Sequence, residues 1–412
     1  MTSEAIDLAD LGLDRGAHVV LERRLRASEP GARLAVHGVD PALSTHLAAW
    51  ARARGHGYEE AGPAEVLAAG VESSGARLVG WLVRGRATGS RWVGARRAGA
   101  ADAGVPDAVA DRADETWGLA ARGASVEAGA RPLHFALSDK DRVWADEVAE
   151  LLRQALAGQW DPATAIPWDA PLEHSDELED ALVQVLTFLI ENETAALIIP
   201  AKFASQVHPH FREVQQLLAI TAADEARHVE VFTRRALMRR DALGLSTVGG
   251  QESLRTLVEE PSFELASLLL SVLGEGSFVN LLWFLHRNAP DECTRAIMKR
   301  TAQDESRHVA FGVAHLARQA RLDPALLERM AASIERRHDA LRETSGLNEE
   351  VFDALVVIAG GSLAPPDVAR GHEAVVDLAA QMHAGRRQRL RLLGFDEPRA
   401  EALSGLHTRN FM

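Results

Sequence analysis

The pattern of hydrophobic and polar positions divides the chain into two parts. The first part, residues 1–130, alternates short β-type runs at 32–37 and 76–83 with helical runs such as 41–54. From residue 140 onward the periodicity is helical almost throughout, with stops at proline and glycine. The predicted organisation is a small α/β domain, an irregular linker and a helical domain, at residues 1–90, 91–139 and 140–412.

The helical part begins with two predicted pairs of long helices. Asp176 and Glu179 have cap spacing at the start of the first helix, and Pro200 is expected to end or kink it. A longer crossover with the turn signal Gly249-Gly250 separates the two pairs. This connectivity predicts a ferritin-like four-helix bundle, so the fold class is mainly α. The four segments are 176–199, 209–239, 262–287 and 291–321.

Further helices are predicted after the bundle. Asp323-Pro324 is a cap followed by proline at a first helical position, and other helices begin near Asn348 and Pro366. Ahead of the bundle, Trp160 is expected to pack against it. The chain is therefore predicted as a bundle with extra C-terminal helices, preceded by the small α/β domain.

Net charge and cysteine content limit the kinds of partner and the cellular compartment that we expect. The formal net charge of -14 argues against a nucleic-acid or anionic-membrane partner. The single cysteine, Cys293, leaves no disulfide framework, which fits a cytoplasmic protein, and no secretory signal is apparent at the start. Residues 265–285 are apolar enough to span a bilayer, but Glu275 at their centre favours a buried bundle helix.

A short repeat lies inside the bundle. The sequence Asp-Glu-Ala-Arg-His-Val from Asp224 recurs as Asp-Glu-Ser-Arg-His-Val from Asp304. Residues three apart share a helix face, so each repeat offers one Glu and one His to a metal ion. Carboxylate with imidazole suits iron or manganese. Alone, one such sequence is more often a solvated charged face; two copies favour a site for two metal ions. The candidate ligands are Glu225, His228, Glu305 and His308.

The other helix of each pair should supply one further glutamate. Glu275 is the only acid in the apolar stretch of the third helix. In the first helix Glu191 and Glu193 compete, and Glu193 is favoured because its helical neighbours are all apolar. A buried carboxylate without a partner is costly, and metal ions would compensate it.

Residues beside the candidate ligands are expected to support them. Metal-bound imidazoles usually donate their second N–H to a carboxylate. Asp224 with His308 and Asp304 with His228 is the simplest crosswise arrangement, and Arg227 and Arg307 are the expected partners of these aspartates.

These residues resemble those of the ferritin-like di-iron carboxylate oxygenases. That family includes the multicomponent monooxygenase hydroxylases, acyl desaturases and ribonucleotide reductase small subunits. The sequence Gly-Glu-Gly-Ser-Phe-Val-Asn at 274–280 is similar to the Gly-Glu-x-x-Phe-x-Asn of the hydroxylases, and the resemblance covers residues 170–320. It implies two iron ions, with Mn/Fe possible, O2 as co-substrate, and Glu225 or Glu305 as a bridge between the metals.

Three features depart from particular members of that family. The only tyrosine is Tyr58, outside the bundle, so a tyrosyl radical of the reductase type has no residue to reside on. Thr301 stands where the arylamine N-oxygenases have an extra histidine ligand. The bundle is also more compact than that of the monooxygenase hydroxylases, which puts their regulatory and reductase partners in doubt.

The N-terminal part weakly resembles the small bacterial sulfur-carrier fold. The βαβα order and the Gly-His at Gly55-His56 carry the resemblance. The reactive Cys-Pro of that family should fall near Leu13-Asp14 and is absent, so no nucleophile for sulfur transfer is present. A docking, dimerisation or lid role is expected instead.

The expected function is that of a two-iron oxygenase of specialised metabolism. It would hydroxylate, desaturate or N-oxidise a small organic molecule. The expected partners are that substrate, an external electron donor of the ferredoxin or reductase type, and a second copy in a homodimer. The alternatives are a ferroxidase or metal-storage protein, and a non-catalytic module stabilised by metal.

Overall fold

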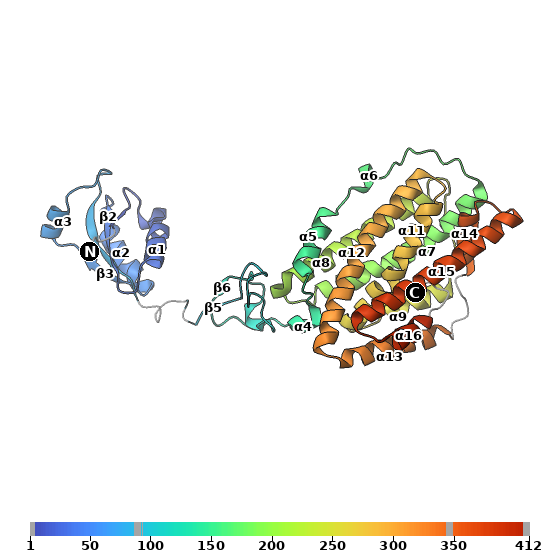
Figure 1. Cartoon of the computed structure of the whole chain (residues 1–412). Helices are drawn as coiled ribbons and strands as arrows, with labels where there is room; N and C mark the ends of the chain where they lie inside the picture. Colours follow the sequence, from blue (N-terminus) through green and yellow to red (C-terminus); the bar gives the residue numbers. More distant parts are fainter. Residues whose placement is uncertain (1–4, 86–91, 93, 343–348, 407–412) are drawn as a thin grey trace. The chain divides into compact units, whose positions relative to one another are not determined.

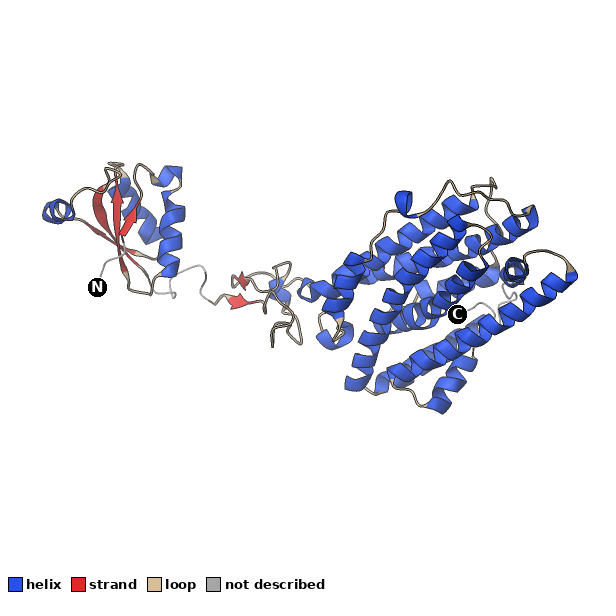
Figure 2. Cartoon of the chain, turned by 45° about the horizontal axis from the view of Figure 1, so that its top comes forward, coloured by secondary structure: helices blue, strands red, loops and turns tan. Residues whose placement is uncertain are grey.

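The computed structural model describes residues 5–85, 92, 94–342 and 349–406. Its internal contacts divide the chain into two compact units. Unit 1 comprises Met1–Ala98 with Ser125–Arg131, and unit 2 comprises Gly99–Ala124 with Pro132–Met412. Helices make up most of unit 2, whereas the main sheet lies in unit 1 (Figures 1 and 2).

Unit 1 is the predicted α/β domain. Its sheet has the order β1-β2-β4-β3, with β1 parallel to β2 and β4 antiparallel to both of its neighbours. Apolar residues that alternate along the strands, such as Val36 and Leu82, form a core with Leu21 and Leu47 of the helices. The expected strands and second helix are confirmed. The elements are β1 Ala5–Asp7, η1 Leu13–Arg15, α1 Ala17–Ala27, β2 Arg33–Gly38, α2 Leu43–Ala53, β3 Gly57–Glu60, α3 Pro63–Ala69 and β4 Arg77–Val83.

The segment between this sheet and the bundle is mostly turns. Residues 99–124 of it are attached to the bundle through Arg122, whose guanidinium lies 2.5 Å from the Glu213 carboxylate. Both side chains are buried, so the ion pair holds an otherwise irregular segment in place. The short elements here are β5 Arg96–Arg97, η3 Glu115–Trp117, β6 Ser125–Val126, α4 Lys140–Val143, α5 Val148–Ala157 and α6 Pro162–Ala165.

The predicted four-helix bundle is present in unit 2. One pair consists of α7 (Asp176–Ala204) and α8 (Arg212–Ala236), which follows η4 (Pro209–Phe211). The other pair consists of a composite helix and α12 (Glu292–Leu322). The composite helix runs through α10 (Phe263–Ser267), a π-helical turn η5 (Leu268–Glu275) and α11 (Gly276–Asn288). The crossover between the pairs contains α9 (Val248–Val258).

The predicted additional helices cover one side of this bundle. Apolar faces of α14 and α15 pack against α7 and α11 (Figure 1). The helices are α13 Ala325–Arg342, α14 Glu349–Gly360, α15 Pro365–Leu393 and α16 Glu397–Gly405.

Three local predictions are corrected by the structure. Of the two effects expected at Pro200, an end of the helix is wrong: α7 continues to Ala204, since its packing against the bundle outweighs one lost backbone hydrogen bond. Gly249-Gly250 is no turn but the first turn of α9, capped by Thr247. The N-cap of α7 is Ser175, and Glu179 is instead buried against an arginine.

Among the described residues, two helices are long and apolar enough to cross a membrane by length and composition. They are Asp176–Ala204 and Phe263–Asn288, and a bent pair of α14 and α15 passes the same test only if taken together. In the first two, 67% and 83% of the apolar window is buried inside the protein. Packing within the bundle therefore accounts for their apolar character.

Candidate metal centre

The structure brings the six predicted ligands together inside the bundle. Each of the bundle's long helices contributes to the site, and all six side chains are buried. The contributions are Glu193 from α7, Glu225 and His228 from α8, Glu275 from the end of η5, and Glu305 and His308 from α12. Glu191, the competing acid, is only partly buried and lies outside the groups of candidate ligand atoms.

The six residues form two overlapping groups of ligand atoms. One consists of Glu193, Glu225, His228 and Glu305, and the other of Glu225, Glu275, Glu305 and His308. Within each group the ligand atoms lie within 4.8 Å of one another. Glu225 and Glu305 belong to both groups, so each is placed to bridge two ions. The sequence left open which of them would bridge.

The imidazoles point their Nδ1 atoms into this cluster. His228 Nδ1 lies 3.0 Å from Glu225 and 3.5 Å from Glu305. His308 Nδ1 lies 3.0 Å from Glu225 and 3.5 Å from Glu305. Each imidazole thus faces both of the shared carboxylates, as expected for terminal ligands on either side of a bridged pair.

The opposite ring nitrogens contact the predicted aspartates in the crosswise pairing. His228 Nε2 lies 3.1 Å from Asp304, and His308 Nε2 lies 3.3 Å from Asp224. An ionised carboxylate can only accept, so each Nε2 carries the proton and each Nδ1 is left free for a metal ion.

A second ring of side chains holds the aspartates. Arg227 donates to Asp224 at 2.5 Å and to Asp304 at 3.0 Å, and Arg307 also contacts Asp304. Trp160 donates its indole N–H to Asp304 at 2.7 Å and lies under the Arg227 guanidinium. The sequence predicted only that Trp160 packs on the bundle, because no local signal reveals a hydrogen bond to a residue so distant in the chain.

Burial and neighbouring charges shift the pKa values of several predicted ligands. Burial raises the pKa of Glu193 to about 8, and the neighbouring charge of Glu225 adds to this. Burial also raises the pKa of Glu275 well above its usual value. For His228, burial lowers the pKa, but Asp304 and the surrounding glutamates outweigh it and raise the pKa well above the usual value.

The donor set fits a pair of hard or borderline metal ions. Both carboxylate oxygens of Glu275 and of Glu305 are buried, and no donor among the described residues reaches them in hydrogen-bonding geometry. Buried oxygens in that position are compensated by cations. Four carboxylates with two imidazoles are a ligand set suited to iron or manganese rather than to a thiolate-preferring metal.

A small enclosed cavity adjoins the site. Its volume is about 20 Å³, enough for a single water-sized molecule. Glu193, Glu275 and Glu305 form one wall. The remaining wall is largely apolar and consists of Asn192, Ala196, Leu257, Leu270, Gly274 and Phe278. The π-helical turn that carries Glu275 and Leu270 was not predicted, since apolar periodicity does not distinguish it from an α-helix.

Other residues singled out from the sequence lie away from this site. Thr301 is fully buried one turn before Glu305 but belongs to neither ligand group. Tyr58 lies in unit 1, where its hydroxyl donates to the Val79 carbonyl at 3.1 Å. Leu13 and Asp14 form part of η1 in the same unit.

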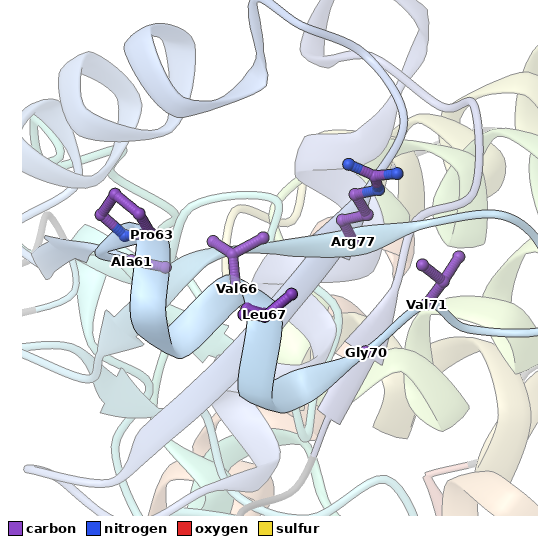
Figure 3. Close-up of a pocket in the computed structure, with 7 residues that line it drawn as sticks. All are labelled: Ala61, Pro63, Val66, Leu67, Gly70, Val71 and Arg77. Carbon is purple, nitrogen blue, oxygen red and sulfur yellow. The ribbon is translucent and has the colours of Figure 1, made fainter.

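Unit 1 has a hollow of its own at its surface. It has a volume of about 480 Å³ and lies along α3, with Leu67 and Val71 exposed and Arg77 at one side (Figure 3). No group of metal-ligating side chains lies there in the described part of unit 1.

No family model matches this chain, and no curated protein matches it. Solved structures do match, among them several R2-like ligand-binding oxidases. A mutant with an Fe/Fe cofactor is 16% identical, with 60% of this chain and 94% of that chain covered and a TM-score of 0.45. A mutant with a Mn/Fe cofactor is 17% identical over 60% and 94%, with a TM-score of 0.46. The ferritin-like arrangement rests on the helices and ligand positions described above.

Proposed function

We propose that this protein binds two metal ions, iron in both positions or manganese with iron, and uses them with O2 to oxidise a small organic molecule. The observation that carries the proposal is the pair of overlapping ligand groups that share Glu225 and Glu305. The Fe/Fe and Mn/Fe cofactors of the similar structures support the choice of metals. The proposed reactions are hydroxylation, desaturation or N-oxidation of the substrate.

The chain's own residues would bind, orient and shield the metal pair. Bound iron would supply the redox chemistry that reaction with O2 requires. Glu193 with His228 and Glu275 with His308 would hold the two ions from opposite sides, and Asp304 and Asp224 keep the ring orientation fixed.

The cavity beside Glu275 is the proposed place for O2. Its partly apolar lining and the burial of all six predicted ligands limit the access of bulk water, which reduces side reactions. A larger organic molecule would have to displace part of that wall, and Leu257, Leu270 and Phe278 are the side chains to move. Electrons would come from an external ferredoxin or reductase, because this reaction class requires a reductant. We propose a cytoplasmic enzyme that forms a homodimer and has no nucleic-acid or membrane partner.

One observation favours a second candidate function. The cavity is large enough for a molecule of the size of O2 but too small for an organic substrate. A cavity of this size would suffice for a ferroxidase. The two functions differ in turnover. An oxygenase given reductant and its substrate consumes O2 over many cycles, whereas a ferroxidase consumes O2 in proportion to the ferrous iron added.

The test begins with metal content. Anaerobic loading with ferrous iron, or with manganese and iron, should give close to two ions per chain by elemental analysis. Glu225→Ala and Glu305→Ala should lose one or both ions, because each residue serves both groups. Glu193→Ala should also lose metal, whereas its neighbour Glu191→Ala is the matched control and should retain it.

Oxygen consumption then tests the activity. Loaded and reduced wild-type protein should consume O2 in an oxygen electrode, and a candidate substrate should increase the number of turnovers. Full metal loading in both Glu225→Ala and Glu305→Ala would refute the ligand assignment. Full loading of the wild type without any O2 consumption would leave a structural metal site and refute the oxygenase.

A further inference from the structure

A second candidate site lies on the outer flank of the bundle. A cleft of about 750 Å³ runs between α11 and α15 and is lined by polar side chains that include Asn280, Gln381 and Gln388. Gly385 forms part of its floor. None of the six predicted metal ligands lines this cleft.

Arg389 does not line the cleft itself but packs against its lining residue Gly385. Two glycines make room for its guanidinium: a Cβ atom on Gly276 would lie 2.2 Å from Arg389 Nε, and one on Gly385 would lie 3.0 Å from an Arg389 terminal nitrogen. The same position above Gly385 is 3.3 Å from the side-chain nitrogen of Asn280. Donors from two helices therefore converge over a glycine in the floor of the cleft.

Arg386 lies close behind Arg389. It is only 3% exposed, and it donates to the Ser277 hydroxyl at 3.1 Å and to the Ser404 carbonyl at 3.4 Å. Its Nε and one terminal nitrogen of Arg389 are buried without a hydrogen-bond partner. Burial and, to a smaller extent, the positive charge of Arg386 together lower the pKa of Arg389 to about 9.

Neither guanidinium has an acidic partner among the residues that the structure describes. The nearby acids are already paired with the rim of the cleft: Glu397 with Arg391 at 2.6 Å, and Glu401 with Arg387 at 3.0 Å. A buried and a half-buried guanidinium side by side without a counter-charge are unfavourable, so an anion from outside the chain would stabilise them.

We propose that the cleft between α11 and α15 binds an oxoanion, the carboxylate or phosphate group of a small metabolite, on Arg389 and Asn280, with Arg386 as supporting charge. One terminal nitrogen of Arg389 and the Asn280 amide nitrogen lie on the same side of Gly385, so together they present N–H groups to two oxygens of such a group, which a single halide ion does not match. The remaining length of the cleft would hold the rest of the molecule against Gln381 and Gln388.

The site is coupled by contact to the helix that carries a predicted metal ligand. Arg389 Nε donates to the Val272 carbonyl at 2.6 Å, inside the π-helical turn that ends with Glu275. Arg389 also packs on Gly276, the residue after Glu275. An anion that fixes the Arg389 guanidinium therefore fixes this turn.

Calorimetric titration of the full chain tests the proposal. Inorganic phosphate and acetate are titrated separately at constant ionic strength, with chloride as the reference anion. We expect saturable binding of at least one of the two oxoanions and none of chloride. Tighter phosphate binding identifies a phosphorylated metabolite, and tighter acetate binding identifies a carboxylic acid. No saturable binding of either oxoanion would overturn the proposal.

Matched variants locate the binding. Arg389→Gln should weaken it about tenfold, the effect of one charge-assisted hydrogen bond. Gly385→Ala should also weaken it, because its methyl group occupies the position between Arg389 and Asn280, while alanine favours the helix and preserves folding. Arg370→Gln, an exposed arginine of the same helix paired with Asp367, should bind as wild type. Unchanged binding in both folded site variants would overturn the location.

Discussion

Single hydrogen bonds determine how the imidazoles of the metal centre are held. Asp304 contacts His228 and is itself held by Arg227, Arg307 and Trp160. An aspartate with that many donors is fixed in orientation, and it transmits the fixed orientation to the ring. Asp304 is not a predicted metal ligand, but it should affect metal binding through His228.

Replacement of this carboxylate should weaken metal binding without loss of a ligand. Asp304→Asn is expected to lower metal affinity about 10–100-fold, because the amide accepts more weakly from His228 and its N–H groups oppose Arg227. Metal titration under anaerobic conditions measures the change. Asp146→Asn, which alters an exposed aspartate paired with Arg318 and Arg321, is the control and should keep wild-type affinity. Equal affinities would contradict the supporting role of Asp304.

Another buried carboxylate predicts a pH dependence of stability. Burial alone would raise the pKa of Glu264, but the hydrogen bonds from Arg142 and Ser262 and the positive charge of Arg142 together outweigh burial and hold the pKa at about 2. A folded-state pKa below the unfolded value stabilises the fold above about pH 4.5, and this stabilisation is lost as the pH falls toward 2. It amounts to at most about 3 kcal/mol.

Glu264→Gln should therefore be less stable than wild type at pH 7 and approach it at pH 3. Urea unfolding at the two values measures the difference in free energy of unfolding. Glu252→Gln, at an exposed glutamate that pairs loosely with Arg255, should show little difference at either pH. A constant gap between Glu264→Gln and wild type across this range would contradict the assignment.

At the scale of helices, close contact depends on particular glycines. In the α14–α15 pair, a Cβ on Gly371 would lie 2.1 Å from the Val356 carbonyl oxygen and 2.9 Å from the Gly360 nitrogen. Gly371→Ala should destabilise the protein by about 1–3 kcal/mol despite the better helix propensity of alanine, because backbone atoms cannot move aside. Gly405→Ala, with no atom within 4 Å of the added methyl group, is the control. Denaturant unfolding measures the free energy of unfolding of both variants. Equal values would contradict the proposed close contact.

The sequence pattern predicted the helices well where the polarity of side chains determines the structure. It predicted them less well where backbone hydrogen bonding determines it. The repeated Glu-x-x-His pairs and the lone Glu275 were visible because each is a polar exception on an apolar face. The π-helical turn before Glu275 was not, because it changes the backbone bonding of an apolar run without changing its composition. Pro200 inside α7 misled for the opposite reason: a strong local signal was overridden by tertiary packing.

At the scale of the molecule, the chain consists of two units with separate cores. The core of unit 1, around Leu21, Val36 and Leu82, shares no residue with those of the bundle. The metal centre lies wholly within unit 2. Ligand binding stabilises the unit that contains the site, so metal ions should act on one unit only.

This separation gives a test that uses the single tyrosine. Tyr58 lies in unit 1, so tyrosine labelling for NMR yields one resonance that reports on that unit alone, while far-UV circular dichroism follows the helices, which lie mostly in unit 2. Anaerobic addition of ferrous or manganous ions should raise the Tm seen by circular dichroism and leave the Tm seen at Tyr58 unchanged. At a free metal concentration of about 100 times the Kd, the bundle should gain about 2.7 kcal/mol.

In Glu305→Ala, which removes a carboxylate common to both ligand groups, the metal-dependent rise should be reduced or lost while the Tyr58 transition stays the same. If both probes move together with metal in the wild type, the two units unfold as one, and the independence inferred from their separate cores is wrong.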